Sequence, residues 1–447
     1  MSPRFDEFAA GLTYDDLPED VLRVLRPSFM DTMGVAAVGS TTPMSAIARK
    51  ASLALFGPGT AGAARMLMDG RAASPAGAAM AGAFTIDSID AHDGITPCKG
   101  HAGSAVFPAM MAMAQAQEHP MTGAEFATIL AIAYEISCRA GLAQHATCAD
   151  YHTSGAWTAV GVAAAGARLL GGDAEVIRHA AGIGEYHGPR SQMMRCIDFP
   201  TNVRDGVGWG APSGVTGAYL AREGFTGAPA LTCEGPGSEP FWDDLGQGWR
   251  LVDHTHYKAY PCCRWAHPAV DGVAHLMQAH DLQHSDVAAV EIKTFHYATR
   301  LAGQSPQTQD EFAYAIAFPV AAMIVRGQVG VAELSQDALN DPDILRVSKA
   351  TTLIDDDHMT AISTDKRWAE VTLVLQDGTR LTDKPRTPRG DPDMPLSDAE
   401  ITAKFHQLAD PVLGTDLSSD IREMALAFDT LDGAGMARLL SLCTDMR

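Results

Sequence analysis

The sequence lacks the features that mark secreted, membrane-spanning and nucleic-acid-binding proteins. Only 33 of its 447 residues are Lys or Arg, against 54 Asp or Glu, which gives a formal net charge of −21. Nucleic acids and anionic membranes bind through basic patches, so this chain is a poor candidate for either partner. The N-terminus has no charged-then-apolar signal pattern, and no uncharged apolar run reaches the roughly 18 residues that a membrane-spanning helix needs.

Cysteine is also sparse, and the eight cysteines form no C-x-x-C pair. In a long chain without a signal peptide, such cysteines are typical of free thiols in a reducing cytoplasm, where we predict the protein to reside. One segment groups potential zinc ligands, namely His254, His256, Cys262 and Cys263. Adjacent cysteines do not fit the usual spacing of zinc ligands, so we predict no metal and keep a zinc protein as a minor alternative.

The residues that are abundant indicate a folded, helical protein with a sizeable core. Apolar residues make up 46% of the chain and charged residues 19%, whereas aromatic residues reach only 7%. Many of the apolar residues are Ala, and Gly is frequent, as in closely packed helices. Residues 15–230 form a succession of segments with helical hydrophobic spacing. Several of these segments are apolar on nearly all faces, which is typical of helices buried among other helices.

The pattern changes after about residue 255. Residues 286–297 alternate β-branched residues with others and predict a strand, and residues 368–383 predict two strands joined by an Asp-Gly turn. We therefore predict a mainly α fold with two domains. A large all-helical domain would comprise residues 1–254 together with 405–447, and a smaller α/β domain would comprise residues 255–404.

One short stretch crowds titratable groups against the start of an apolar helix. Residues 92–110 are HDGITPCKGHAGSAVFPAM, and Asp90 lies just upstream. A helix start offers free N–H groups and a positive dipole end, where a carboxylate is stabilised, and Lys99 adds a charge there. Asp90 and His101 are candidates for base and acid across a bound substrate, with Ser104 beside them. The alternative is a polar loop that merely caps a core helix.

Three further segments carry candidate residues. His152 precedes a second buried helix, so both histidines are expected to face one cavity. Lys258 and Arg264 lie where the two predicted domains join, a common place for ligand clefts. Arg204 lies in a glycine-rich segment and is a candidate clamp for a carboxylate. The glycines around it follow no clear strand, so a dinucleotide-binding loop is not favoured there.

Several motifs resemble those of the MmgE/PrpD family, in the same order along the chain. They are IDSIDAHDG (86–94), GHAGSAVFPAMMAMAQ (100–115), YHTSGAWTAVGVAAAGARLLG (151–171) and YKAYPCCRWAHPAVD (257–271). The resemblance implies a helical domain with an α/β lid domain, a homodimer, no metal or organic cofactor, and a small polycarboxylate as substrate. It also implies catalytic roles for four residues, which are Asp90, His101, His152 and Lys258.

The sequence departs from the family pattern at several of these positions. The family motif H-P-G-S is His-Ala-Gly-Ser at 101–104, and residues 92–94 replace an Asp-Asp-Thr. The family's mid-chain lysine is missing, and Arg204 or Asp205 lies nearest to its position. A tyrosine of some members corresponds to Phe318. These departures indicate a divergent branch of the family.

Together these observations predict a lyase of the dehydratase type that acts on a small di- or tricarboxylate. The substrate-binding residues are predicted to be Lys99, Arg204, Ser104 and Arg264. Asp90 or His152 is expected to remove a proton next to a carboxylate, and His101 to protonate a leaving hydroxyl or a carbon. The alternatives are an epimerase of a dicarboxylate, a decarboxylase of a cis-aconitate-like acid, and a non-catalytic binder of small acids.

Overall fold

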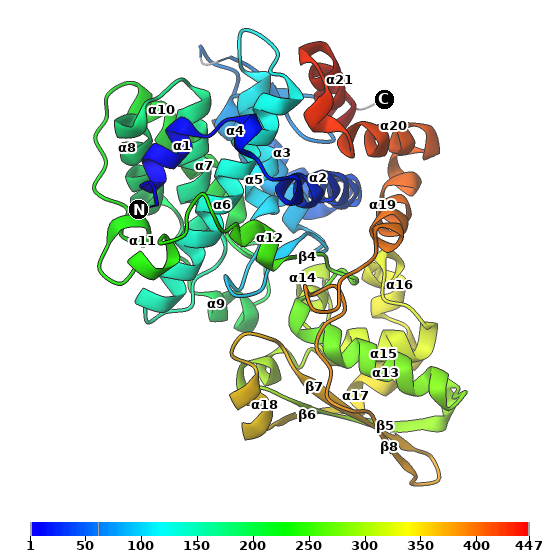
Figure 1. The fold of residues 1–447 in the computed structure, drawn as a ribbon. Coiled ribbons are helices and arrows are strands. Elements are labelled where there is room, and N and C mark those ends of the chain that lie inside the picture. Colours follow the sequence, from blue (N-terminus) through cyan, green and yellow to red (C-terminus); the bar gives the residue numbers. More distant parts are fainter. Residues whose placement is uncertain (1, 61, 446–447) are drawn as a thin grey trace.

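Helices make up most of the chain, as predicted, and the sheets are small (Figure 1). The computed structural model describes residues 2–60 and 62–445. We call the helices α1–α12 and α19–α21 the helical region. Its N-terminal helices are α1 (Phe5–Gly11), α2 (Glu19–Gly39), α3 (Pro43–Leu55), α4 (Pro75–Asp87), α5 (Gly103–Gln115), α6 (Gly123–Thr147), α7 (Gly155–Leu169), α8 (Ala174–His187), α9 (Met193–Asp198), α10 (Val207–Arg222), α11 (Leu231–Glu234) and α12 (Arg250–His254).

The centre of the helical region is built from α5, α6, α7 and α10, which are apolar and buried almost all round. Small residues let these helices approach closely. A Cβ at Gly161 of α7 would lie 2.1 Å from the Ser137 hydroxyl of α6, so a larger residue there would push the two helices apart. By length and composition α6 is able to cross a membrane, but 94% of its most apolar window is buried inside the protein. It is therefore the core helix of this fold.

A buried ion pair in α6 fixes the path of the chain toward the second half of the molecule. Arg139 Nε lies 2.7 Å from Glu135 Oε1, and neither side chain is exposed. Arg139 also donates to the carbonyl oxygen of Gly248, while Glu135 accepts hydrogen bonds from the backbone N–H groups of Arg250 and Leu251 at the start of α12. These contacts satisfy both buried charges and hold the segment that leads to residue 258.

A four-stranded mixed sheet lies in the second half of the chain, and we call it and its helices the sheet region (Figure 1). The strand order is β6-β5-β7-β8, with β5 parallel to β6 and antiparallel to β7. The strands are β5 (Val287–Thr294), β6 (Thr351–Asp355), β7 (Ala369–Leu375) and β8 (Arg380–Thr382). The helices are α13 (His267–Ala279), α14 (Gln309–Ala313), α15 (Ala317–Arg326), α16 (Gln336–Leu339), α17 (Pro342–Lys349) and α18 (Asp357–Ile362).

The predicted strands and the Asp-Gly turn are present, since Gly378 has φ +85° between β7 and β8. The prediction omitted β6, a strand of five residues directly after α17. Such a short segment carries little periodicity, and it becomes a strand because β5 offers it a free edge. Four short strands form two antiparallel pairs elsewhere. They are β1 (Ala64–Arg65) with β2 (Ala72–Ala73), and β3 (Gly94–Ile95) with β4 (Thr255–His256), which is distant in sequence.

The last helices return to the helical region (Figure 1). The first of them begins behind a capping box in which Ser397 and Glu400 bond each other's backbone N–H groups. It packs on α2, where Phe405 fills the space left by Gly34 and Lys404 Nζ lies 2.8 Å from the buried Asp31. The three helices are α19 (Asp398–Leu413), α20 (Thr415–Ala425) and α21 (Gly433–Thr444).

Candidate functional site

A narrow cavity lies between the helical region and the sheet region. Its free volume is about 40 Å³, which suffices for a few water molecules. Residues from seven separate chain segments line it, so the cavity exists only in the folded chain. They are Asp90, Ile95, Thr96, Lys99, Gly100, His101, Tyr151, Met193, Asp205, His256, Lys258, Cys263, Arg264, Trp265, Tyr314 and Arg367.

The pairing of β3 with β4 brings the two most polar segments together. Gly94 pairs with His256, and Ile95 pairs with Thr255. A Cβ at Gly94 would lie 2.4 Å from His256 Nε2, so only glycine allows this close approach. The replacement at residue 94 noted in the sequence therefore has a structural cause, because the backbone must pass close to the His256 ring.

Asp90 and Lys258 form a buried ion pair at the inner end of the cavity. Lys258 Nζ donates to the Asp90 carboxylate at 2.5 Å and to the Asp90 carbonyl oxygen at 3.0 Å. Lys258 is only 1% exposed, and Asp90 is 5% exposed. Asp90 has φ +52°, a conformation that non-glycine residues rarely adopt. Such strain is concentrated at functional sites, and here it turns the carboxylate toward the lysine.

His101 is held so that one ring nitrogen faces the cavity. Its Nδ1 lies 2.6 Å from the carbonyl oxygen of Asp93, which only accepts, so Nδ1 carries the proton of the neutral ring. Its Nε2 is 3.8 Å from Asp205 Oδ2. Burial lowers the pKa of His101 well below its ordinary value of 6.5, and the nearby positive charge of Lys258 lowers it further. His101 is therefore a neutral imidazole with a free lone pair, suited to accept a proton first.

Asp205 is the partner of His101 in the cavity. Burial raises its pKa from 3.8 to about 7, and the negative charge of Asp87 adds to the effect. The Ser154 hydroxyl donates to Asp205 and accepts from the His101 backbone N–H at 2.9 Å, so it fixes both groups relative to each other. With a pKa of about 7, a large share of the Asp205 carboxyl is still protonated at neutral pH, beside a neutral imidazole. This acid–base pair is the central chemical feature of the cavity.

Three helix N-termini meet behind this pair, those of α5, α7 and α10. The first N–H group of α7, at Gly155, donates to the Asp205 carbonyl oxygen at 3.0 Å, and Gly103 N–H at the start of α5 donates to the Asp93 carboxylate at 3.2 Å. A Cβ at Gly155 would lie 2.2 Å from the Gly206 carbonyl oxygen, so α7 and α10 meet only because glycine stands there. The positive ends of helix dipoles stabilise negative charge at such a place.

Four cationic side chains line the cavity, and their partners differ. Lys258 is paired with Asp90, and Arg264 binds both carboxylate oxygens of Asp391. Lys99 and Arg367 have no carboxylate partner among the described residues of the chain. Three of these cations were predicted from the sequence, whereas Arg367 has no motif around it and was missed.

Three predicted residues do not line the cavity. The buried His152 ring is close to Asp150 and Arg190, and its neighbour Tyr151 faces the cavity instead. Arg204 is buried beneath the site, where its Nη2 donates to the Ser88 carbonyl oxygen at 2.7 Å and its Nε lies 2.7 Å from Asp310. Ser104 is buried in the first turn of α5. The catalytic role of His152 and the binding roles of Arg204 and Ser104 stay predictions.

Besides Arg367, two other notable residues that were not predicted from the sequence lie in the site. Asp205 was noted only as a neighbour of Arg204, and its importance comes from burial and from its contact with Ser154. Tyr314 lines the cavity, whereas Phe318 is buried in the core of α15. Tyr314 lies four residues before Phe318 in the same segment of the sequence.

One group of side chains in the described part of the chain has metal-ligand spacing, and it consists of Asp90, His92 and His101, with ligand atoms within 4.8 Å of one another. Two of these residues, His92 and Asp90, already have partners. His92 Nε2 is 3.1 Å from Asp87, and the Lys258 ammonium occupies the cation position beside Asp90. Because a metal ion would have to displace that lysine, the donor set fits a metal poorly. The suggested zinc ligands at 254–263 do not form such a group.

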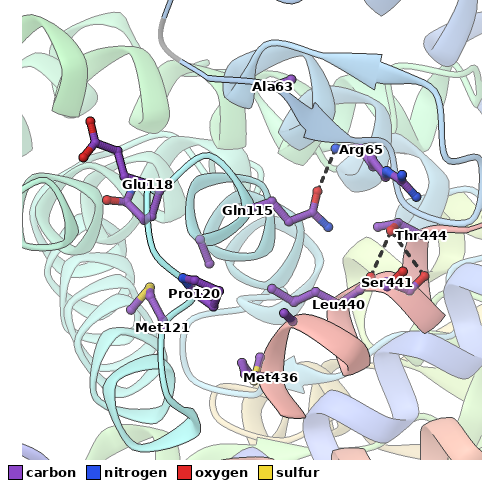
Figure 2. A pocket seen from close by; sticks show the side chains of 13 residues that line it. Ala63, Arg65, Gln115, Glu118, Pro120, Met121, Met436, Leu440, Ser441 and Thr444 are labelled. Atoms are coloured by element: carbon purple, nitrogen blue, oxygen red, sulfur yellow. Dashed lines mark hydrogen bonds between the residues drawn. The ribbon is translucent and has the colours of Figure 1, made fainter. Parts of the chain in front are cut away.

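A larger hollow, of about 330 Å³, lies on the helical region near α5 and α21 (Figure 2). Figure 2 shows the Gln115 side chain accepting a hydrogen bond from the Arg65 backbone N–H, at 2.7 Å. Arg65 is paired with Asp445, and Glu118 is the only other charged residue among the described residues that line the hollow. These described residues include no cluster of acids, bases or nucleophiles like that of the narrow cavity.

Comparisons with known proteins cover almost the whole chain. The family model described as the MmgE/PrpD N-terminal domain matches residues 4–239, and that of the MmgE/PrpD C-terminal domain matches residues 260–430. The chain is 23% identical to a cis-aconitate decarboxylase-like protein of Aspergillus oryzae, over 96% of this chain and 94% of that protein. It is 22% identical to cis-aconitate decarboxylases of Aspergillus terreus (95% and 92% covered) and Homo sapiens (96% and 92% covered).

Proposed function

The chain belongs to the MmgE/PrpD family, and from this we propose that it is a cofactor-independent lyase acting on a small di- or tricarboxylate. The observation that carries the proposal is the pairing of a neutral His101 with a protonated Asp205 beside the Asp90–Lys258 ion pair. A neutral base and a protonated acid side by side, 3.8 Å apart, are suited to an elimination that removes a proton and a hydroxyl from the same side of the substrate. The cationic side chains in the lining suit an anionic substrate.

In the proposed elimination, His101 Nε2 removes a proton from the carbon next to a substrate carboxylate. The electron pair of that C–H bond forms a carbon–carbon double bond, and the hydroxyl on the neighbouring carbon leaves with the proton of Asp205 as water. The imidazolium then returns its proton to Asp205, 3.8 Å away, and the site is restored. The Lys258 ammonium stabilises the negative charge that develops on the substrate carboxylate. This assignment makes His101 the first base, in place of the acid role expected from sequence.

Decarboxylation is the second candidate, because the relatives named above are cis-aconitate decarboxylases or resemble them. The same groups serve that reaction, in which a carbon–carboxylate bond breaks, CO₂ leaves, and Asp205 or the His101 imidazolium delivers a proton to carbon. An epimerase would use the two groups on opposite faces of one carbon. We favour a lyase because His101 Nε2 and Asp205 Oδ2 are only 3.8 Å apart, too close to lie on opposite faces of one substrate carbon.

The test is proton NMR of the purified protein in D₂O with cis-aconitate, citrate, 2-methylcitrate, malate and iminodisuccinate. A new alkene signal with loss of a hydroxyl-bearing carbon indicates a dehydratase. Loss of one carboxylate with release of CO₂ indicates a decarboxylase. Exchange of a C–H signal without a new product indicates an epimerase and contradicts the lyase. Saturable binding without turnover of any compound contradicts an enzyme of this substrate class.

Replacing Asp205 by asparagine is expected to lower kcat about 100-fold, the low end of the effect of a general acid, because water can still protonate the leaving group. The pH profile gives the sharper test. Asp205 acts in its protonated form, so the activity of the unmodified protein falls as the pH rises through about 7. In Asp205→Asn this alkaline limb disappears. An unchanged limb near pH 7 in the variant would contradict the role of Asp205.

We also propose two domains, as expected for this family. One comprises residues 1–254 with 405–447, and the smaller one, residues 255–404, acts as a lid over the cavity.

We propose a homodimer as well, also as expected for this family. Exposed apolar side chains support a surface for self-association, and four large ones come from residues 186–209. Light scattering is expected to give twice the chain mass of 47.3 kDa. In a twofold interface each substitution acts twice, so Trp209→Asp is expected to shift the protein to monomer. A monomeric unmodified protein would exclude the dimer. The four side chains are Tyr186, Phe199, Val203 and Trp209.

A further inference from the structure

Two cationic side chains at the outer end of the cavity, Lys99 and Arg367, form no ion pair with any described residue. The other two cations of the lining, Lys258 and Arg264, are each matched by a carboxylate, at Asp90 and Asp391. Unmatched buried positive charge is costly, because the group loses its hydration without gaining a partner. A charged ligand that enters the cavity removes that cost.

Arg367 is the more informative of the two. It is only 5% exposed, and its Nη1 donates to the carbonyl oxygens of Ser363 and Lys366, each at 3.0 Å. Its Nε is buried without a hydrogen-bond partner, and its Nη2 has none among the described residues. Nε and Nη2 are the two donors on one edge of the guanidinium, the edge with which Arg264 binds Asp391. Arg367 therefore presents a free bidentate fork that matches a carboxylate.

Lys99 is fixed by its backbone with its charge close to Arg367. Its φ of +54° is rare for a non-glycine residue, and the Tyr151 hydroxyl holds its carbonyl oxygen at 2.8 Å. Its Nζ lies 5.5 Å from the centre of the Tyr151 ring. Burial lowers the pKa of Lys99, and the positive charge of Arg367 is the next largest cause. Two like charges held this close in a partly buried place are stabilised by an anion between them.

The positions of Lys99 and Arg367 indicate which kind of anion would bind between them. An outer hollow of about 530 Å³ adjoins the narrow cavity, and Lys99, Tyr151, Trp265 and Arg367 line both. The outer hollow has the size of a small-molecule site, whereas the inner cavity holds only a few waters. Lys99 comes from the helical region and Arg367 from the sheet region. A ligand that touches both therefore carries negative charge at this outer end, in addition to the carboxylate next to the reacting carbon at the inner end.

We propose that Lys99 and Arg367 form a subsite for a second carboxylate of the substrate, which makes the site selective for di- and tricarboxylates over monocarboxylates. This subsite rests on the proposed function, since it takes the inner end of the same cavity as the place of reaction. One carboxylate lies near Lys258, and the distal carboxylate accepts two hydrogen bonds from Nε and Nη2 of Arg367 and one from Lys99. The bound substrate links the helical region to the sheet region across the entrance.

The experiment measures binding, by calorimetry, of three unreactive acids that differ in carboxylate number: propane-1,2,3-tricarboxylate, butanedioate and butanoate. The unmodified protein is expected to bind the first two more tightly than butanoate. Charge-assisted hydrogen bonds contribute about 1.5–3 kcal/mol, so Arg367→Gln and Lys99→Gln are each expected to weaken binding of the first two about 10- to 100-fold. Butanoate binding is expected to stay unchanged.

Two further variants make the result specific. Lys366→Gln is the matched control, because Lys366 is the sequence neighbour of Arg367 but is bonded to Asp393 on the surface. It removes the same charge and is expected to bind like the unmodified protein. Arg367→Lys keeps the charge and loses the fork, so it is expected to bind between the unmodified protein and Arg367→Gln. Thermal melting shows whether Arg367→Gln folds. If it does not fold, Arg367→Lys tests the subsite in its place.

The outcomes separate the subsite from the reaction. Selective binding that depends on Lys99 and Arg367, without turnover of any polycarboxylate, supports the subsite and contradicts the lyase. Turnover of a polycarboxylate with equal affinities in Arg367→Lys, Lys99→Gln and Lys366→Gln supports the lyase and overturns the subsite. Failure of the unmodified protein to prefer polycarboxylates over butanoate also overturns the subsite.

Discussion

Replacing His101 by alanine is expected to reduce turnover about 10²- to 10⁴-fold, the usual contribution of one well-placed general base. The ring is held by the Asp93 carbonyl oxygen at 2.6 Å and packs on the His92 ring, with the ring centres 4.4 Å apart. Both contacts orient Nε2 toward the cavity. Loss of the imidazole leaves Asp205 without the group that takes the substrate proton and later returns it. The measurement is kcat and KM on whichever polycarboxylate the NMR panel identifies.

A control separates this effect from damage to the fold. His280 is exposed at the end of α13, and His280→Ala is expected to leave both turnover and melting temperature unchanged. Added imidazole is expected to enter the space left in His101→Ala and to restore part of the turnover. The restored turnover is expected to rise with the concentration of neutral imidazole, since the neutral form acts as the base. A loss smaller than tenfold in a folded His101→Ala protein would remove His101 from the mechanism.

The sequence predicted the helical part of the fold well, because its signals are local. The apolar spacing of α2 and the Ser397–Glu400 capping box of α19 both depend on residues within a few turns of one another. The strand β6 was missed because its conformation depends on β5, about 60 residues earlier in the chain. Local patterns do not contain that information.

The same distinction holds for the site. Asp90, His101 and Lys258 were predicted from motifs at two places in the sequence, and the pairing of β3 with β4 brings those places together. Asp205 is one acidic residue among 54 by composition, and its raised pKa comes from burial near Asp87, a contact between distant segments. Arg367 is a candidate only because its side chain is buried without a carboxylate partner among the described residues, and no sequence motif shows this. Such residues are found only when the burial and partners of each charge are known.

Replacing Lys258 by methionine is expected to lower both stability and turnover. Methionine keeps most of the volume but removes the charge that neutralises Asp90, and breaking a buried ion pair in this way costs about 3–5 kcal/mol of unfolding free energy. Turnover is expected to fall at least about 10²-fold, the effect of removing one electrostatic stabiliser of the developing charge. Urea unfolding gives the first quantity and steady-state kinetics the second.

The double variant Asp90→Asn with Lys258→Met distinguishes the structural part of this effect from the chemical part. Because both charges are then absent, the buried site no longer contains an unpaired ion, and most of the lost unfolding free energy is expected to return. Turnover is not expected to return, since no ammonium faces the substrate carboxylate. If the double variant recovered activity along with stability, the charge of Lys258 would serve only to neutralise the charge of Asp90. If Lys258→Met alone cost less than about 1 kcal/mol, the pair would behave like a surface salt bridge, in conflict with its burial.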